Sequence, residues 1–556
     1  MQPKTPQSND FAIVGRGTPW DIIANDALAS KRKFRPEPII FCCESGLGAS
    51  GFPHIGSFSD GARAFTVKLA AEDQGNPAKY IAYSDDLDGL RKVPAGMSAE
   101  LEDYLAVPVS KIPDEFGCHD SFGSHMSSLL LESFDAAGIE YQFVSATELY
   151  RKGAYTSVIS KILENFDRAG RIIAEETSQT KYTEVLPFHS ICAECGRIYT
   201  THPLEHVIGK NAVKYSCDGA EVSDRDIEGC GYRGYADYSI GEGKLGWKVE
   251  FAARWATLGI DFEAYGKDIF ESVKANDRIC REILGVEPPY HVRYEMFLQK
   301  EGKKMSKSAG GALTPQRWLQ YGTSQSLMLL MLKRIEGSRN IGLEDIPIHM
   351  DELDELEAVY FGLRRAKNEA AQRKAKGLYE YCFLLKPPES PSIHVPYQLL
   401  TTLLRYAPVD KAEPFIFEKL DEYGYFSDEE DWKTAVAERR LEELPERFQK
   451  VRKHLPLVKN WVEKTVTSEE TYFGFTNGQK IAINDLIPLL KKANTADEFQ
   501  SAIFAVCKKN SLSPRELFPA LYQIFIGTQK GPKLGPLLAL MGSDAVIQKL
   551  TVILER

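Results

Sequence analysis

The first hundred residues alternate between short apolar runs and a longer amphipathic stretch, a pattern typical of helices packed on a parallel sheet. The run at 38–43 predicts a buried strand, because strands covered on both faces carry few polar residues. Small residues at 45–51 predict a loop, and apolar positions at helical spacing continue until Gly75. A second strand is predicted at 79–84. This order of elements indicates a doubly wound, Rossmann-type α/β domain.

The rest of the chain divides into further regions by its periodicity. The pattern predicts a helix and a short strand within 125–149 and one long amphipathic helix at 151–177. Periodicity disappears over 188–235, where Cys, Gly and His become frequent, and the α/β pattern returns at 245–300. From about residue 311 onward we expect an almost wholly helical region, with helical patterns at 351–385, 396–406, 433–454, 480–509 and 513–525.

Composition and charge narrow the class of protein. The 556 residues are 43% hydrophobic and 26% charged, which excludes a disordered or low-complexity chain and suits several globular domains. The net charge of −10 excludes a basic coat, so nucleic acid would have to bind a local basic face. The chain has no apolar run of membrane-spanning length, no secretory signal and only sparse cysteines. We therefore expect a cytoplasmic enzyme without membrane association.

The segment Pro53-His54-Ile55-Gly56-Ser57 lies where the glycine-rich loop enters the first predicted helix. A helix N-terminus presents N–H groups and a positive dipole end to phosphate, and a histidine there can donate to phosphate oxygens. Upstream, Gly46, Gly48 and Gly51 remove side chains where a nucleotide would lie. The alternative is a tight turn with a surface histidine.

A basic segment, Lys304-Met305-Ser306-Lys307-Ser308, follows a glycine-led stretch. Two lysines on a flexible loop can close on the β- and γ-phosphates and neutralise charge as pyrophosphate departs. The alternative is a solvated basic loop, which is the usual meaning of a charge run taken alone.

Four cysteines within 192–230 indicate a metal site. They begin with a CxxC pair, and four thiolates at such spacing suit a closed, tetrahedral Zn²⁺ site: Cys192, Cys195, Cys217 and Cys230. Nearby His189, His202 and His206 could replace a ligand or hold a second metal, and a further alternative is reduced, buried thiols. Because no open three-ligand set with a general base accompanies them, the zinc is expected to be structural.

Together the histidine and lysine motifs resemble the HIGH and KMSKS signatures of class I aminoacyl-tRNA synthetases, in the order found in that family. Longer stretches resemble the archaeal-type class I lysyl-tRNA synthetase family, most specifically 83–94 and 253–263. The resemblance covers about residues 15–350 well and the helical tail more loosely. Shorter matching segments are Glu44-Ser45-Gly46, Trp247-Lys248-Val249-Glu250, Tyr265-Gly266-Lys267-Asp268 and Tyr294-Glu295-Met296-Phe297-Leu298.

The resemblance implies ATP-dependent ligation of L-lysine to tRNA(Lys) through a lysyl-adenylate, with release of AMP and pyrophosphate. ATP would enter with Mg²⁺. The residues implied to stabilise charge on the phosphates are His54, Ser57, Lys304 and Lys307. The implied ATP-binding residues are Gly51, Pro53, His54, Gly56, Gly266, Asp268, Phe297, Leu298, Lys304, Met305 and Lys307.

A lysine substrate needs a carboxylate for its ε-ammonium and an apolar or aromatic slot for its stem. Acidic residues fall at the expected ends of the first two strands, where doubly wound folds bind ligands: Glu44, Asp85, Asp86 and Asp88. The residues expected to bind lysine are Glu44, Gly46, Gly48, Asp85, Asp86 and Trp247. Gly48 stands where family members often carry a threonine that contacts lysine.

These residues can also be interpreted as having structural roles only. The aspartates could cap a helix and pair with Arg91 and Lys92, and Trp247 could belong to the ordinary core.

We expect six segments along the chain. They are an N-terminal extension at 1–36, the first half of the catalytic domain at 37–150, an insertion with a zinc-binding module at 151–236, the second half of the catalytic domain with the KMSKS loop at 237–310, a connecting helical segment at 311–350 and an all-α anticodon-binding helical cage at 351–556. The resemblance implies tRNA(Lys) as the macromolecular partner. The oligomeric state is left open, with a monomer as the expectation.

Three other functions compete with this hypothesis. A glutamyl-type class I synthetase would need cationic groups beside the first signature, where this chain has Glu44. A non-catalytic, synthetase-derived, zinc-containing RNA-binding protein would have lost its signatures, whereas His54, Gly56, Lys304 and Lys307 are intact. A small-molecule adenylyltransferase of the same superfamily would have no use for the long helical tail.

Overall fold

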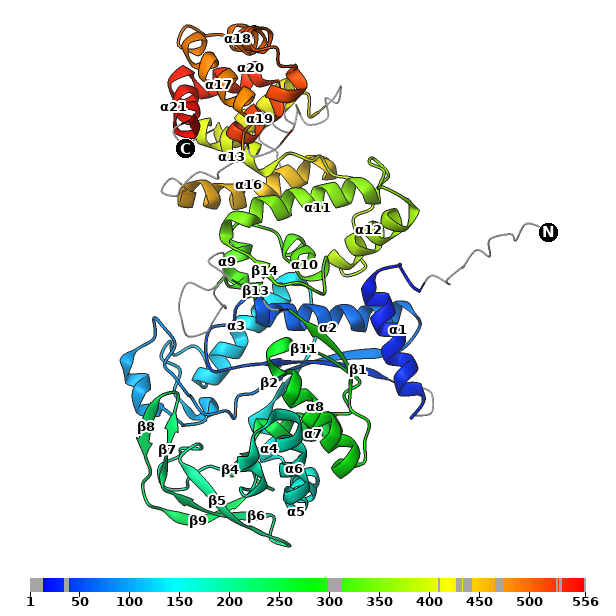
Figure 1. Cartoon of the computed structure of the whole chain (residues 1–556), viewed down its shortest axis with the longest axis vertical. Coiled ribbons are helices and arrows are strands. Elements are labelled where there is room, and N and C mark those ends of the chain that lie inside the picture. Colours follow the sequence, from blue (N-terminus) through cyan, green and yellow to red (C-terminus); the bar gives the residue numbers. More distant parts are fainter. Residues whose placement is uncertain are drawn as a thin grey trace, which may run out of the picture. The chain divides into compact units, whose positions relative to one another are not determined.

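Figure 1 shows the computed structural model, which describes residues 14–34, 40–295, 297–298, 313–408, 411–426, 433, 443–465, 474–526, 529 and 533–554. The chain divides into two units. The first unit comprises Met1–Trp318, Ser324–Leu343 and Arg365–Pro387, and the second comprises Leu319–Thr323, Glu344–Arg364 and Pro388–Arg556.

A parallel sheet of five strands forms the centre of the first unit, in the order β12-β11-β1-β2-β3. The strands are β1 (Phe41–Leu47), β2 (Ala78–Ser84), β3 (Gln142–Ser145), β11 (Phe262–Gly266) and β12 (Tyr290–Tyr294). The helices around it are α1 (Pro19–Arg32), α2 (Ile55–Asp73), α3 (Phe122–Ala137), α7 (Trp247–Leu258) and α8 (Phe270–Ile279), with α2 on one side of the sheet and α7 and α8 on the other (Figure 1). The prediction of an α/β domain built on a parallel sheet is confirmed.

The first strand differs from its predicted position. β1 begins at Phe41 and continues through Ser45, Gly46 and Leu47, which the sequence pattern places in a loop; these three residues pair with Ala82–Ser84 of β2. Backbone pairing with β2 holds these small residues in the strand, and the Ser45 hydroxyl lies 2.6 Å from the Tyr80 hydroxyl in the interior. As a result, Glu44 lies in the middle of β1 and not at its end.

The single long helix predicted at 151–177 is wrong. The chain instead forms α4 (Ala146–Arg151), α5 (Thr156–Glu164) and α6 (Phe166–Thr177). Gly153 adopts φ +68°, which favours glycine and separates α4 from α5. The amide of Asn165 donates to the Lys161 carbonyl at 2.8 Å, which competes with the helical backbone bonds and separates α5 from α6.

The region without periodicity is built from short strands. They are β4 (Phe188–Ser190), β5 (Thr201–Val207), β6 (Ala212–Cys217), β7 (Gly219–Val222), β8 (Arg225–Glu228), β9 (Arg233–Asp237) and β10 (Gly243–Leu245). β5, β6 and β9 form one antiparallel sheet, β7 and β8 form a hairpin, and β4 pairs with β10. The β4·β10 pair is where the chain enters and leaves this insertion.

Helices dominate the rest of the described chain. The first unit holds β13 (Phe297–Leu298), β14 (Arg339–Asn340), α10 (Ser324–Leu332) and α12 (Glu369–Cys382), and α9 (Pro315–Leu319) lies at the unit boundary. The second unit holds α11 (Ile346–Tyr360), α13 (Tyr397–Tyr406), α14 (Ala412–Glu422), α16 (Glu446–Thr465), α17 (Asn477–Leu490), α18 (Ala496–Lys509), α19 (Pro514–Ile526), α20 (Leu534–Met541) and α21 (Ser543–Leu554). The pattern predicted at 351–385 is interrupted because Gly362, with φ +78°, ends α11 and Asn368 caps α12.

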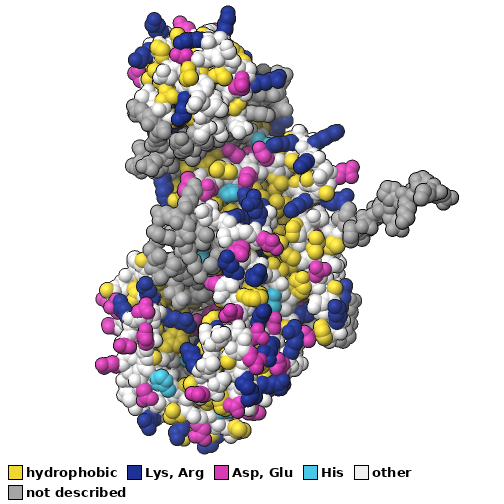
Figure 2. Space-filling model, viewed as in Figure 1, with side chains coloured by type: hydrophobic (Ala, Val, Ile, Leu, Met, Phe, Trp, Pro, Cys, Tyr) yellow, Lys and Arg dark blue, Asp and Glu magenta, His cyan; other side chains and the backbone are white. Residues whose placement is uncertain are grey.

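The distribution of charge on the surface and the apolar character of the helices agree with what the composition predicts. Positive and negative side chains are interspersed on the face drawn in Figure 2, without a coat of one sign. In the described part of the chain, no single helix combines the length and apolar character that a membrane crossing requires, although the sharply bent pair α20 and α21 meets those criteria together.

Candidate active site

A cavity of about 370 Å³ opens where β1, β11 and β12 end and α2 begins. This is the edge at which doubly wound sheets bind ligands. The residues predicted from the sequence that line it are Gly46, His54, Gly56, Asp85, Gly266, Asp268 and Phe297. Those that the structure describes outside its lining are Glu44, Gly48, Gly51, Pro53, Ser57, Asp86 and Trp247. Lys304, Met305 and Lys307, together with the side chain of Leu298, lie outside the described residues.

His54 caps the N-terminus of α2 with its own side chain. Its Nδ1 accepts from the backbone N–H groups of Gly56 at 3.0 Å and Ser57 at 3.3 Å. A neutral imidazole that accepts at Nδ1 carries its proton on Nε2, so the ring is a hydrogen-bond donor at that atom. Position 56 must be glycine for this geometry, because a Cβ there would lie 2.6 Å from the ring of His54.

Arg254 gathers three carboxylates at one end of the cavity. Glu44 in β1 and Glu263 in β11 are register partners on adjacent strands, so their side chains lie side by side. The Arg254 guanidinium lies 2.8 Å from Glu44, 3.0 Å from Glu263 and 3.4 Å from Asp85. One cation thus faces three acids.

Burial and mutual repulsion make this cluster costly to ionise. Burial raises the pKa of Asp85 to about 7 and raises that of Glu44 well above its ordinary value, although Arg254 opposes both shifts. Among the described residues that line the cavity, Arg254 is the one with a permanent positive charge, whereas Asp60, Asp85, Glu263 and Asp268 can all be negative. The cavity is therefore suited to a ligand that brings positive charge.

Arg254 and Glu263 were missed as site residues by the sequence reasoning, although both lie in the stretch 253–263. Local spacing gives no signal for this cluster, because the carboxylates that pair with Arg254 lie in β1, in the turn after β2 and in β11. The cavity wall also includes Phe251, one turn after Trp247, in the apolar role that was expected of Trp247.

The predicted acidic residues Asp86 and Asp88 bind protein groups outside the cavity. Asp86 accepts from the Thr147 N–H at 2.8 Å and from the Ser145 hydroxyl at 2.5 Å, which fixes the start of α4. Asp88, whose side chain is 35% exposed, lies 2.5 Å from the ammonium of the buried Lys244 and forms an ion pair with it.

At the opposite end of the cavity, Tyr294 at the end of β12 donates to Asp60 of α2. The guanidinium of Arg63 lies 4.6 Å from the centre of the Tyr294 ring. Asp60 and Tyr294 were also missed, because only the fold brings the end of β12 to α2. Gly266 lies next to Asp268, and a Cβ at 266 would come within 2.8 Å of the Asp268 carboxylate.

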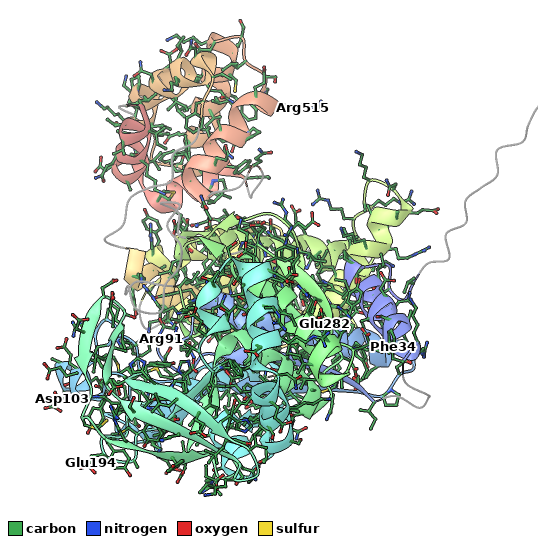
Figure 3. All side chains as sticks on the ribbon, turned by 60° about the horizontal axis from the view of Figure 1, so that its bottom comes forward. Phe34, Arg91, Asp103, Glu194, Glu282 and Arg515 are labelled. Atoms are coloured by element: carbon green, nitrogen blue, oxygen red, sulfur yellow. The ribbon has the colours of Figure 1, made fainter. Side chains whose placement is uncertain are left out.

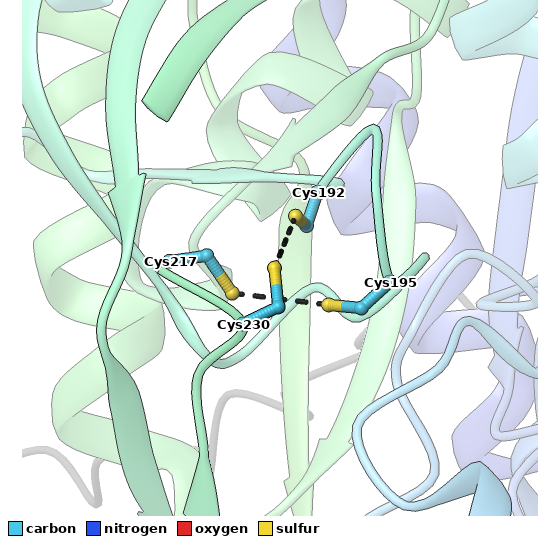
Figure 4. Close-up of side chains that lie close together, drawn as sticks. All are labelled: Cys192, Cys195, Cys217 and Cys230. Atoms are coloured by element: carbon cyan, nitrogen blue, oxygen red, sulfur yellow. Dashed lines mark hydrogen bonds between the residues drawn. The ribbon is translucent and has the colours of Figure 1, made fainter. Parts of the chain in front are cut away.

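The four predicted cysteine ligands converge (Figure 4). The Cys192 and Cys230 sulfurs are 3.5 Å apart, those of Cys195 and Cys217 are 3.8 Å apart, and all four lie within 4.8 Å of one another. Sulfurs at the usual Zn–S distance of about 2.3 Å in a tetrahedron are about 3.8 Å apart, so the set fits Zn²⁺. The group lies at the outer part of the first unit, where Glu194 between the first two ligands is exposed (Figure 3).

The three histidines considered as alternative ligands lie outside this group. His202 Nε2 is 2.7 Å from the Gly219 carbonyl, His206 Nε2 is 3.1 Å from the Tyr238 hydroxyl, and the His189 ring packs edge-on against Tyr199. A different group, formed by the loop before α3 and the first turn of α3, also has the donor types of a metal site, with ligand atoms within 4.8 Å of one another: Asp114, Cys118, His119 and His125.

Comparison with known protein families identifies the family to which this chain belongs. The model of the family described as tRNA synthetases class I (K) matches residues 19–383, and that of an anticodon binding domain matches 409–554. The chain belongs to the class I (K) tRNA synthetase family. The recognition of this family from the sequence is confirmed.

Curated relatives of this synthetase family match over nearly their whole length. A lysine–tRNA ligase of Cenarchaeum symbiosum (strain A) is 43% identical over 96% of this chain and 98% of its own. Lysine–tRNA ligases of Haloarcula marismortui and Roseobacter denitrificans are 29% and 30% identical, each over 96% of this chain and over 98% and 96% of their own length.

Proposed function

We propose that this protein is a lysine–tRNA ligase, which couples L-lysine to tRNA(Lys) at the expense of ATP through a lysyl-adenylate. The observation that carries the proposal is the excess of carboxylates around Arg254 in a cavity that begins at the His54 helix cap. A negatively charged slot selects a substrate with a cationic side chain, and the adjacent helix start suits phosphate. This charge disfavours the glutamyl alternative.

In the first step, the lysine carboxylate attacks the α-phosphorus of ATP in line, and the bond to the β,γ-pyrophosphate breaks. His54 accepts two backbone N–H groups at Nδ1, so its Nε2–H is the donor that it can offer to a phosphate oxygen. Lys304 and Lys307 are assigned to the same phosphates on the basis of the sequence. Mg²⁺ travels with ATP, and Asp268 beside Gly266 is assigned to the ribose hydroxyls.

In the second step, the terminal ribose 2′-hydroxyl of tRNA attacks the adenylate carbonyl, and AMP leaves. The reaction needs no covalent enzyme intermediate, so catalysis consists of positioning and electrostatic stabilisation. We assign anticodon recognition to the helical part of the chain that the anticodon-domain model matches, 409–554. The six segment boundaries given above, a monomeric state and a cytoplasmic location belong to this proposal.

The four-cysteine group is assigned to a structural Zn²⁺ that holds the insertion together. When bound, the ion would cross-link β6 with the turns after β4 and before β9, and it takes no part in the chemistry. Metal analysis of purified protein tests this assignment. Cys195→Ser should lower the zinc content by about one per chain relative to wild type. Cys118→Ser, in the other group, should leave that zinc in place; equal zinc in wild type and Cys195→Ser would contradict the assignment.

Amino-acid-dependent pyrophosphate exchange, with each of the twenty amino acids and with or without total tRNA, tests the function. Exchange with lysine alone is expected. His54→Ala should lower that exchange by about 100-fold or more, because one donor to the developing charge is lost. Exchange with another amino acid would overturn the lysine assignment and leave the ATP site standing. No exchange with any amino acid, even with tRNA, would overturn the enzymatic function.

A further inference from the structure

The insertion is joined to the rest of the first unit by a two-stranded stem, β4 and β10. Lys244 lies at the middle of β10, opposite His189 of β4, and Cys192 comes two residues after the end of β4. Lys244 is 2% exposed, which is unusual for a lysine and requires that its charge be paired.

Two carboxylates hold the Lys244 ammonium in place. Its Nζ lies 2.5 Å from Asp88 and 2.8 Å from Glu250. Burial lowers the pKa of Lys244, but the two carboxylates outweigh burial and raise it well above the ordinary value, so the lysine stays charged. The Tyr150 hydroxyl donates to the other oxygen of Glu250 at 3.1 Å.

Each partner of Lys244 is directly linked to a residue of the substrate cavity. Asp88 is in the turn that begins at Asp85, and its N–H donates to the Asp85 carbonyl at 3.2 Å. Glu250 precedes Arg254 by one turn on α7. Lys244 therefore connects the turn that carries Asp85 to the helix that carries Arg254, the two groups that meet across 3.4 Å in the cavity.

We propose that Lys244 is a positioning residue for the substrate cavity, through which the stem of the insertion sets the affinity for the lysine substrate. The inference rests on the proposed function. By holding the Asp85 turn against α7, Lys244 keeps the acidic cluster at the spacing that receives a substrate ammonium. When a group that positions the substrate is displaced by about 1 Å, the reaction rate can fall by about 100-fold.

The charge of Lys244 also acts on Asp85. The charged groups around Asp85 come from several elements: Arg254 and Glu250 of α7, Lys244 of β10, Asp88 of its own turn, Glu44 of β1 and Glu263 of β11. Lys244 lowers the pKa of Asp85, so its loss should raise that pKa further. The pH at which kcat/KM for lysine begins to rise should then move upward.

Lys244→Met tests the proposal, with Lys450→Met as the matched control. Lys450, with a side chain 15% exposed, also lies between two carboxylates, 2.6 Å from Asp354 and 2.7 Å from Glu357, but these three belong to the second unit. Both variants should melt at lower temperature. In lysine-dependent pyrophosphate exchange, only Lys244→Met should raise KM for lysine about tenfold or more while KM for ATP stays within about twofold.

Two further variants keep the test decisive if Lys244→Met does not fold. Asp88→Asn retains the volume and leaves Lys244 paired with Glu250, and it should raise KM for lysine about threefold or more without affecting ATP. Lys244→Arg keeps the charge and should restore KM for lysine to within about threefold of wild type.

The results can contradict the positioning role of Lys244 without contradicting the proposed lysine–tRNA ligase function. An unchanged KM for lysine in Lys244→Met or Asp88→Asn would overturn the positioning role. It would also be overturned if KM rose equally for lysine and ATP, or if Lys450→Met raised KM for lysine as much as Lys244→Met does. An upward shift of the acidic limb of the pH profile in Lys244→Met supports the role, and an unmoved limb contradicts it. Absence of lysine-dependent exchange in the wild type would overturn the proposed function itself.

Discussion

Each unit of the protein contains a buried cluster of charges, and the two clusters differ in their balance. In the first unit, Arg254 faces Glu44, Asp85 and Glu263 beside a cavity. In the second unit, Lys450 lies between Asp354 and Glu357, and Glu357 is also 3.2 Å from His394 and accepts from the Ser392 N–H at 2.6 Å.

The pKa shifts of Asp85 in the first cluster and Glu357 in the second run in opposite directions. Burial raises the pKa of Asp85 to about 7, whereas the Lys450 ammonium, His394 and the Ser392 N–H hold the pKa of Glu357 well below its usual range in spite of burial. A carboxylate with a lowered pKa is already satisfied by its protein partners. For Asp85, burial outweighs the attraction of Arg254, so a cationic ligand in the cavity would supply charge that this carboxylate lacks. Together with the cavity that Asp85 lines, this difference favours a substrate site around Arg254 and a structural cross-link between helices around Lys450.

The largest effect is expected from Asp85→Asn, which removes one unsatisfied charge from the cavity. We expect kcat/KM for lysine to fall by about 100-fold or more, with KM for ATP little changed, because a buried partner of the substrate cation is lost. Steady-state pyrophosphate exchange measures both constants. An unchanged lysine dependence would show that the unbalanced cluster is not the substrate site.

The same substitution should change the pH dependence of stability. The pKa of Asp85 is higher in the folded protein than in the unfolded chain, so this group destabilises the fold progressively as pH rises from about 4 to about 7. Asp85→Asn should remove that slope and melt at higher temperature than wild type at pH 8. For the wild type, kcat/KM for lysine should rise with pH through about 7, as Asp85 ionises.

Lys450→Met should have a large effect on stability and none on substrate affinity. Removing the Lys450 ammonium leaves Asp354 and Glu357 without the cation that they share, although Glu357 keeps His394 and the Ser392 N–H, and costs about 3–5 kcal/mol of unfolding free energy. Denaturant unfolding and lysine KM, measured on the same preparation, separate the two effects. A higher KM for lysine in Lys450→Met would contradict the purely structural role of the cluster around Lys450.

The smallest effect is expected at Trp247. Phe251 lines the cavity, whereas Trp247 packs against Phe251 at 6.2 Å between ring centres and has the Lys248 ammonium 4.2 Å from its ring. Phe251→Ala should raise KM for lysine by about tenfold, since the apolar wall for the substrate stem is lost. Trp247→Ala should change it by less than about threefold. The reverse order would place the wall at Trp247.

The elements that depend on local pattern could be predicted from the sequence. The helix that begins at His54 follows from its periodicity and glycine-rich entry, and the convergence of Cys192 with the three later cysteines follows from their spacing. The strands of the insertion could not be predicted, because they are three to seven residues long and show no alternation.

The acidic cluster could be predicted only in part, because it depends on strand order. Glu44 and Glu263 become neighbours through the pairing of β1 with β11, which are far apart in the chain. Asp85 and Asp86 are adjacent in sequence, yet one faces the cavity and the other the start of α4. Nothing in the sequence pattern distinguishes them.

The most direct test of the account compares lysine with norleucine, which has the same stem without the ε-ammonium. Wild type should prefer lysine by about 10⁴-fold in kcat/KM for pyrophosphate exchange, because norleucine would leave the three carboxylates around Arg254 without a second cation. This preference should fall sharply in Asp85→Asn and persist in Lys450→Met. A wild-type preference below about tenfold would contradict the claim that the unbalanced charge of this cavity selects the substrate.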